Sequence, residues 1–292
     1  MSVTVVGSIA YDRVKTPFGE RERMLGGAAT HFALAASFFD EVRLVGPVGD
    51  DFSDFDVLQT RGSNVEDVEQ VEGQTFFWWG EYGWDLNSRE TLDTQLGVFE
   101  TFDPKLSEGS KAAETLFLAN IQPDLQRTVR EQCQASFVAM DSMNLWIEIA
   151  RDSLVQTISG VDCVILNDAE LRQLTEKPNL VAAAREVLAM GPSVIVAKQG
   201  EYGAALITAD EFFSLPAYPL ETVIDPTGAG DTFAGGFVGW LAKHPGDYRT
   251  AMAYGTALAS YNVEEFGTER VLRLTLDEVE DRVSALASMT RL

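Results

Sequence analysis

Runs of apolar residues alternate with amphipathic stretches along most of the chain. Val3 to Ile9 is mostly apolar, and after residue 111 short apolar runs of the kind seen in Val194-Ile195-Val196 recur between longer mixed segments. A continuous apolar run predicts a strand buried on both faces, and the mixed segments carry the periodicity of helices. The strands are predicted at 115–119, 137–140, 161–166 and 193–197, and the helices at 124–133, 145–158, 169–175, 180–190, 231–243 and 247–263.

This alternation predicts a mostly parallel central sheet with helices on both faces, which is a three-layer α/β/α sandwich. The chain has 292 residues, shows no internal repeat and contains no long linker. We therefore expect one domain over residues 1–292 instead of two separate ones.

Two stretches depart from the pattern and predict a small accessory sheet, or lid. Residues 11–24 are polar and rich in turn formers, which is typical of a loop or small hairpin. Residues 63–101 are rich in β-forming and aromatic residues, with Trp78, Trp79 and Trp84 close together. Two interpretations stay open for these aromatics: a hydrophobic cluster beneath a loop, or a lid that closes over a flat ligand.

The charge of the chain excludes some partners. The net charge is −23, from 22 basic and 45 acidic residues, so the surface repels phosphate backbones and anionic lipid. We expect no nucleic-acid partner and no membrane partner. The basic residues include only 6 Lys, and low lysine with abundant acid raises the hypothesis of a high-salt cytoplasm.

The cysteines and the first residues point to a cytoplasmic location. Cys133 and Cys163 do not have the spacing of metal ligands, and a pair this sparse fits a reducing compartment. The apolar run at the N-terminus has no basic leader and is too short for a signal peptide.

The strongest chemical signal is a glycine-rich turn at residues 225–237, Asp-Pro-Thr-Gly-Ala-Gly-Asp-Thr-Phe-Ala-Gly-Gly-Phe. Gly228 and Gly230 permit backbone angles that point amide N–H groups into one concavity, at the positive end of the following helix. Such a turn binds anions, and Asp231 beside it is placed to accept a proton from an attacking hydroxyl. The plainer alternative is a tight turn in which Asp231 caps the helix.

This segment resembles the C-terminal signature of the ribokinase family, the PfkB-type carbohydrate and nucleoside kinases. The resemblance extends over nearly the whole chain and implies a ribokinase-like α/β/α sandwich with a β-sheet lid. It also implies that Asp231 is the catalytic base and that the amides of Gly228, Ala229 and Gly230 form the anion hole. Asp225 matches a residue that often belongs to a monovalent-cation site, such as one for K⁺.

The acceptor side resembles the family too. Asp12 follows Gly7-Ser8-Ile9-Ala10-Tyr11 and matches the family's substrate-binding Asp, and Gly26-Gly27 matches its N-terminal Gly-Gly signature. His31 stands where the family commonly has Asn, which puts the familiar sugar contact in doubt, although a neutral His still donates one hydrogen bond. Asp141 resembles part of the family's Asp-x-Asn stretch near the sugar.

The donor side completes the resemblance. Asn167 and Glu170 are similar to the family's Asn-x-x-Glu motif, which implies Mg²⁺ bound partly through water; ordinary helix capping is the alternative. Lys198 with Gly200 and Gly203 resembles the family's nucleotide turn and implies contacts to ATP. Asn262 lies in the stretch that matches the adenine pocket. No P-loop motif is present in the sequence.

The sequence therefore predicts an ATP- and Mg²⁺-dependent kinase that phosphorylates a hydroxyl of a small sugar. A nucleoside is the close alternative, because a flat base would stack on the lid aromatics. A regulator that binds a ligand without catalysis is the rival from another class, and the intact Gly228-Ala229-Gly230-Asp231 argues against it. A homodimer formed through the lid is a further expectation.

Overall fold

A computed structural model describes residues 2–290. Its centre is a nine-stranded sheet in the order β13-β12-β11-β10-β9-β8-β1-β4-β5, in which only β12 runs in the opposite direction, antiparallel to its neighbours β11 and β13. The strands are β1 (Ser2–Val6), β4 (Glu41–Val48), β5 (Asn64–Gln70), β8 (Thr115–Leu118), β9 (Phe137–Asp141), β10 (Cys163–Asn167), β11 (Val194–Lys198), β12 (Ala204–Ile207) and β13 (Phe212–Leu215).

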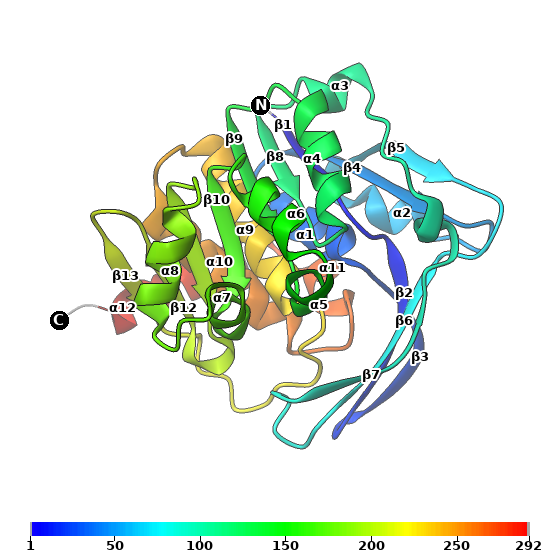
Figure 1. Ribbon diagram of the computed structural model, residues 1–292. Helices are drawn as coiled ribbons and strands as arrows, with labels where there is room; N and C mark the ends of the chain where they lie inside the picture. Colours follow the sequence, from blue (N-terminus) through cyan, green and yellow to red (C-terminus); the bar gives the residue numbers. More distant parts are fainter. Residues whose placement is uncertain (1, 291–292) are drawn as a thin grey trace.

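Helices cover both faces of this sheet (Figure 1), so the predicted three-layer fold is confirmed. One face packs against α1 (Ala28–Ala36), α9 (Ala229–Lys243) and α10 (Tyr248–Asn262), with α11 (Glu269–Arg273) and α12 (Leu276–Met289) beyond them. The other face carries α4 (Pro123–Gln132), α5 (Asn144–Ile149), α6 (Arg151–Ile158), α7 (Asp168–Thr175) and α8 (Leu180–Leu188). The short elements are α2 (Phe55–Leu58), α3 (Glu108–Lys111), η1 (Thr60–Gly62), η2 (Gly97–Thr101) and η3 (Gly200–Tyr202).

The apolar runs of the sequence are buried because each strand contacts a helix layer on either side. All four residues of β8 are buried, and alternate strand residues join different clusters: Phe117 packs toward α1 and α9, whereas Leu116 and Leu118 pack toward α4 and α6. Burial on both faces explains why these strands lack the alternation of half-exposed ones.

A four-stranded sheet in the order β3-β2-β6-β7 projects from one end of the domain (Figure 1). It consists of β2 (Ala10–Thr16), β3 (Gly19–Gly26), β6 (Phe76–Tyr82) and β7 (Arg89–Gln95). This sheet corresponds to the predicted lid, with one difference. Residues 64–70 lie in β5, which pairs with β4 in the large sheet, so the second part of the lid begins later than residue 63.

Three local predictions also differ from the structure. The helix expected over 145–158 is broken at Ala150, whose φ of −140° is not helical, so α5 and α6 are separate. The β-forming residues of segment 222–224 predict a strand-like approach to the glycine turn, but this segment is irregular. Helices α11 and α12 lie in a region for which no element was predicted.

No helix within residues 2–290 combines the length and the apolar character that crossing a bilayer requires.

Candidate active site

The glycine turn reaches α9 through a residue that has to be glycine. Gly228 is the N-cap of α9 and has a φ of +73°, in the left-handed region. A Cβ at this position would lie 2.3 Å from the imidazole ring of His31. Backbone conformation and space both exclude a side chain, so the turn approaches α1 closely.

Two of the three predicted anion-hole amides are free to bind a ligand. The N–H of Ala229 donates to the carbonyl of Pro226 (3.2 Å) and is therefore engaged inside the turn. The N–H groups of Gly228 and Gly230 have no hydrogen-bond acceptor anywhere in residues 2–290. They lie at the positive end of the 15-residue helix α9, where an anion is stabilised.

Asp231 is the third residue of α9 and lies beside these amides. Burial raises its pKa to about 7, and the negative charge of Asp141 adds to the effect, while Lys198 and Arg89 oppose it. A carboxyl with this pKa exchanges protons near neutral pH, as a general base requires.

Three predicted residues meet at the carboxyl ends of adjacent parallel strands. Asp141 ends β9, Asn167 ends β10 and Lys198 ends β11, and these strands are neighbours in the sheet. Functional side chains gather at this edge of α/β sheets because all the parallel strands end there.

Lys198 brings a positive charge to the glycine turn. Its Nζ donates to Oδ2 of the buried Asp141 (2.7 Å) and lies 3.0 Å from where a Cβ of Gly230 would stand. Burial alone would lower the pKa of Lys198, but the charges of Asp141, Glu170 and Asp231 outweigh it and the pKa is raised. The ammonium group therefore stays charged next to the free amides. Asp141, expected near the sugar, is the partner of this lysine.

Asn167 and Glu170 form the capping box of α7. The side chain of Asn167 accepts from the N–H of Glu170 (2.8 Å), and Glu170 accepts from the N–H of Asn167 (2.9 Å). Burial and the negative charge of Asp141 raise the pKa of Glu170, and the positive charge of Lys198 opposes both effects. The resulting pKa is about 7. The two residues therefore cap the helix, as the alternative to a metal site predicts. The cap uses one carboxylate oxygen of Glu170, and the other has no partner among the described residues.

The oxygens of Asn167 and Glu170 fit a metal ion that takes most of its ligands from water and from the substrate. Residues 2–290 contain no group of three or more His, Cys, Asp or Glu side chains that could enclose a metal. Mg²⁺ is commonly bound by one or two protein oxygens, with waters and substrate phosphates supplying the rest. Glu170 and Asn167 fit that use.

Asp12 lies on β2 against the Gly26-Gly27 turn. A Cβ at Gly26 would come within 1.9 Å of Oδ2 of Asp12, so the glycine allows the backbone to contact this carboxyl. Burial and the negative charges of Asp225 and Asp231 raise the pKa of Asp12, while the N–H of Gly27 and the charge of Arg89 lower it. The resulting pKa is about 8. At neutral pH the group carries a proton and can donate a hydrogen bond to a substrate hydroxyl.

The remaining predicted residues lie behind the turn. Asp225 is fully buried, and its two oxygens accept from the N–H groups of Thr227 (2.9 Å) and Gly267 (3.0 Å). Burial raises its pKa, and these hydrogen bonds oppose the increase. His31 and Asn262 are also buried and contact each other (3.2 Å). The side chain of Asn262 therefore contacts α1 instead of a predicted adenine site, and a K⁺ site at Asp225 stays a prediction.

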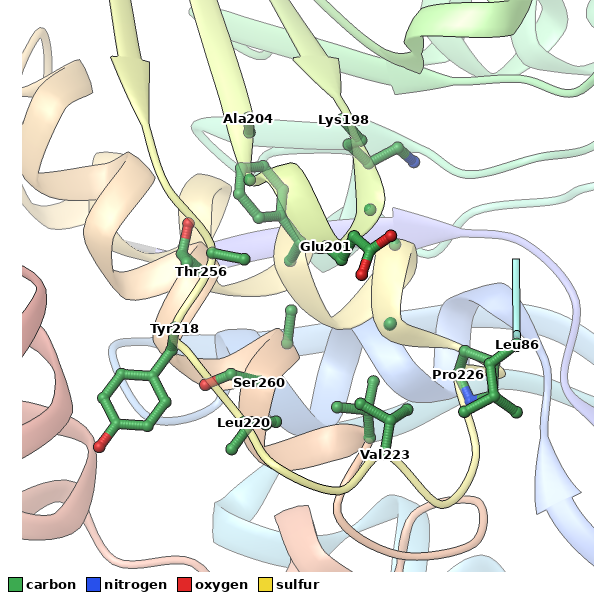
Figure 2. Close-up of a pocket in the computed structure, with 18 of the residues that line it drawn as sticks. Leu86, Lys198, Glu201, Ala204, Tyr218, Leu220, Val223, Pro226, Thr256 and Ser260 are labelled. Carbon is green, nitrogen blue, oxygen red and sulfur yellow. The ribbon is translucent and has the colours of Figure 1, made fainter. Parts of the chain in front are cut away.

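A cavity of about 450 Å³, which we call the donor cavity, opens beside the glycine turn (Figure 2). Lys198, Gly200, Gly203 and Gly230 line it, which brings the predicted nucleotide turn together with the anion hole. Its far wall comes from two segments. The irregular segment 217–223, which was not predicted, contributes Ala217, Tyr218, Pro219, Leu220 and Val223; α10 contributes Thr256, Ala259 and Ser260, and the last two lie in the stretch around Asn262 that matches the adenine pocket. Segment 217–223 contains one proline, Pro219, and has no periodic pattern from which a binding wall could be recognised.

The lid contributes to both halves of the site. The tip of the β6–β7 hairpin lines the donor cavity with Asp85, Leu86 and Asn87, and Asn87 Nδ2 donates to Glu201 of η3 (3.4 Å). Arg89, which sequence reasoning left out, begins β7. Its charge lowers the pKa of Asp12, Glu170 and Asp231, and its guanidinium lies 5.3 Å from the centre of the Trp78 ring.

The lid aromatics do not form one patch. Trp78 packs near Val14, Tyr82 and Phe266, and its indole covers Gly80, where a Cβ would lie 2.1 Å from the ring. Trp79 lies on the opposite face of β6, beneath Arg13 at 4.3 Å, and Trp84 is almost fully exposed. Trp78 belongs to a hydrophobic cluster, and among these three tryptophans it alone shares the lid face of Asp12, its register partner; closure of the lid over a flat ligand stays a prediction.

The sequence matches kinases of known family. The family model for the pfkB family carbohydrate kinases matches residues 100–273, more than half of the chain. A cytidine kinase from Thermococcus kodakarensis is 29% identical over 252 residues, covering 83% of this chain and 89% of the relative. A ribokinase from Bacillus subtilis is 26% identical over 298 residues, covering 97% and 99%.

Solved structures share the fold over nearly the full length. The nucleoside kinase of Methanocaldococcus jannaschii matches with a TM-score of 0.81 at 22% identity, covering 97% of this chain and 98% of that one. A protein from E. coli described as a ribokinase II, solved with ATP and Mg²⁺, matches with a TM-score of 0.78 at 19% identity, covering 97% and 99%. At these identities the likeness shows the fold.

Proposed function

This chain belongs to the pfkB family of carbohydrate kinases, and we propose that the sugar hydroxyl it phosphorylates is part of a nucleoside. Membership makes the chain an ATP-dependent phosphotransferase with a hydroxyl acceptor, so the kinase prediction is confirmed. The proposal concerns the acceptor, for which the sequence left a free sugar and a nucleoside open.

The observation that carries the proposal is the register between Asp12 and Trp78. The two residues are partners on the parallel strands β2 and β6, so their side chains project from the same face of the lid about 5 Å apart. The six-membered ring of the indole lies over Gly80, the guanidinium of Arg89 lies 5.3 Å from the ring centre, and the side chain is only partly buried. The carboxyl of Asp12 can bind a sugar hydroxyl, and the aromatic ring of Trp78 beside it can contact a planar base. This pair suits a ligand with a sugar at one end and a base at the other.

The relatives support the same choice without deciding it. The cytidine kinase and the M. jannaschii nucleoside kinase act on nucleosides by name, whereas the B. subtilis relative is a ribokinase. A free pentose is therefore the second candidate. It would use Asp12 and the Gly26-Gly27 turn and leave Trp78 without a role in binding.

The proposed chemistry is in-line transfer of the γ-phosphoryl group of ATP. Asp231 in its ionised form accepts the proton of the acceptor hydroxyl, whose oxygen forms the new bond to phosphorus as the bond to the leaving oxygen of ADP breaks. The free amides of Gly228 and Gly230, the positive end of α9 and the ammonium of Lys198 stabilise the charge on the transferring group.

Asn167 and Glu170 would hold Mg²⁺ beside the phosphates, partly through water. The metal would supply positive charge against the phosphate oxygens when it is bound. One carboxylate oxygen of Glu170 accepts the hydrogen bond that caps α7, and this bond fixes the direction in which the other oxygen points.

The proposal is tested by measuring ADP formation with cytidine, adenosine, uridine, ribose and fructose as acceptors, at saturating ATP and Mg²⁺. We expect kcat/KM for at least one nucleoside to exceed that for every free sugar by at least tenfold. A free sugar that matches or exceeds the best nucleoside would overturn the assignment and leave the kinase activity intact.

A further inference from the structure

Asn262 connects three elements behind the anion hole. It is the last residue of α10, it is fully buried, and its side-chain amide contacts the glycine turn, α9 and α1. We propose that Asn262 is a positioning residue, which aims the N–H of Gly228 at the transferring phosphoryl group. This inference rests on the kinase activity but not on the identity of the acceptor.

The argument begins with one peptide group. Asn262 Nδ2 donates to the carbonyl oxygen of Thr227 at 2.8 Å. The described chain contains no cis peptide bond, and in a trans peptide the C=O and the following N–H point in opposite directions. A carbonyl of Thr227 held toward α10 therefore turns the N–H of Gly228 away from α10. That N–H is one of the two free amides of the turn.

The hydrogen-bond network defines which way the amide of Asn262 faces. A carbonyl oxygen only accepts, so the NH₂ group must face Thr227, and Oδ1 then faces Thr232 and His31. Oδ1 accepts from the hydroxyl of Thr232 at 3.0 Å and lies 3.2 Å from Nδ1 of His31. The reverse orientation would bring two acceptors to 2.8 Å at Thr227, so it is excluded.

This orientation assigns the tautomer of His31 as well. Nδ1 carries the proton and donates to Asn262, and Nε2 keeps its lone pair without a hydrogen-bond partner among the described residues. Burial lowers the pKa of His31 to about 4, so the ring stays neutral at physiological pH. The neutral ring packs flat against Gly228, where a Cβ would lie 2.3 Å away.

Gly228 is thus constrained from two sides by groups that Asn262 holds. The carbonyl of the preceding residue is fixed by Nδ2, and the ring against its Cα is oriented by Oδ1. Glycine at φ +73° has broad conformational freedom, so without such restraints the direction of its N–H would vary. An anion hole acts by having its donors oriented before charge develops, and this is the effect we assign to Asn262.

The test compares Asn262→Asp with Thr232→Val in steady-state kinetics, using the best acceptor of the panel. The introduced carboxylate has the same shape and keeps an acceptor for Thr232 and His31, but it replaces the NH₂ that binds Thr227. At alkaline pH, where the introduced carboxyl is ionised, we expect kcat to fall at least tenfold, with KM for ATP and for the acceptor changed less than about threefold, because the loss concerns the transition state. Thr232→Val removes a neighbouring hydrogen bond to the same amide, and its kcat should stay within about threefold of the wild type.

A pH series separates positioning from a general loss of packing. The buried carboxyl that Asn262→Asp introduces should have a raised pKa, and in its protonated form it can donate to Thr227 again. The ratio of kcat for this variant to kcat for the wild type should therefore rise as the pH falls. Taking the ratio removes the titration of Asp231 that both proteins share. Other titratable groups near this position are His31 of α1, which contacts Asn262, and Asp225, whose carboxylate accepts from the N–H of Thr227.

The outcomes decide in either direction. Equal kcat losses in the two variants, with equal losses of melting temperature and a ratio independent of pH, would show that Asn262 acts only in packing and would overturn the proposal. If Asn262→Asp does not fold, Asn262→Ser carries the same kcat expectation, because it removes the NH₂ group without adding charge and its shorter side chain places the hydroxyl farther from the carbonyl of Thr227. Wild-type kcat in a folded Asn262→Ser variant would also overturn the proposal.

Discussion

The ammonium group of Lys198 lies 2.7 Å from the carboxylate of Asp141, and the pair stands between the ends of β11 and β9. The two residues are far apart in sequence and meet only because β9, β10 and β11 are adjacent in the sheet. The charge of Asp141 acts on Asp231 as well as on Lys198, so the pair helps to determine the pH at which the base becomes active.

The wild-type kcat/KM should rise with pH through an apparent pKa near 7, because Asp231 must be ionised to accept a proton. Asp141→Asn removes a negative charge that raises the pKa of Asp231, so the acid limb of the profile should move to lower pH. The measurement is kcat/KM from about pH 5.5 to about pH 9 for both proteins. A limb that stays in place or moves to higher pH would contradict the assigned coupling.

Asp231→Asn should bind ATP normally and lose kcat by roughly 10²–10⁴, since the amide keeps the shape of the side chain but cannot accept the proton. Calorimetric titration with ATP measures the first quantity and ADP release measures the second. Asp168→Asn is a suitable control, because Asp168 pairs with Arg172 on the surface of α7. A loss of only a few fold at Asp231 would remove it from the role of base.

Trp78→Ala should raise KM for the nucleoside at least fivefold and leave KM for ATP nearly unchanged. Stacking of a base on an aromatic ring is worth roughly 1–3 kcal/mol. Trp79→Ala is the matched control, because the same side chain is removed from the next position on the opposite face of the lid. If both variants raise KM equally, the effect comes from a loosened lid and the stacking role of Trp78 is rejected.

Chelation of Mg²⁺ should abolish turnover, and Glu170→Gln should raise the Mg²⁺ concentration needed for half-maximal rate. The amide of Gln keeps an oxygen that can cap the N–H of Asn167, so α7 should remain folded. The measurement is the initial rate over a Mg²⁺ titration at fixed ATP, with circular dichroism to confirm folding. An unchanged titration curve in the Glu170→Gln variant would place the metal away from Glu170.

Asp12→Asn should stabilise the protein, and more so at higher pH, while it weakens acceptor binding. The folded-state pKa of Asp12 is raised to about 8, well above its unfolded value, so its ionisation opposes folding. That cost is absent below the unfolded pKa, grows as the pH rises from there and is complete above the folded pKa. Melting temperatures at about pH 5 and about pH 8.5 test this, and a smaller gain at the higher pH would contradict the pKa assignment.

Sequence reasoning succeeded where a feature is encoded within a few neighbouring residues. The apolar runs predict strands such as β8 and β10, and the glycines of residues 225–237 predict the turn before α9, because burial and backbone freedom act locally. It could not show that the N–H of Ala229 is engaged by Pro226, since that depends on the exact turn. The sequence also does not predict the contact between Asp141 and Lys198, because that contact depends on the order of β9, β10 and β11 in the sheet, which neither segment determines.

The donor cavity shows the same limit. One wall comes from the nucleotide turn around Gly200, which the sequence predicts, and the other from segment 217–223, which has no pattern. Asn262 was expected in this cavity from its position near the end of α10. Its side chain faces the turn instead, because an amide buried at that helix end is satisfied by the carbonyl of Thr227.

The contact between Asn87 and Glu201 has a consequence for the order of events in a catalytic cycle. In the proposed function, the hairpin that carries Asn87 would lie over the nucleotide, and the same sheet carries Asp12, the proposed contact to the acceptor. If this sheet moves as one body, a single movement would open both binding positions, and ADP and the phosphorylated product would leave in the same step. The turnover rate would then be limited by how quickly this hairpin detaches from Glu201 whenever the chemical step is faster.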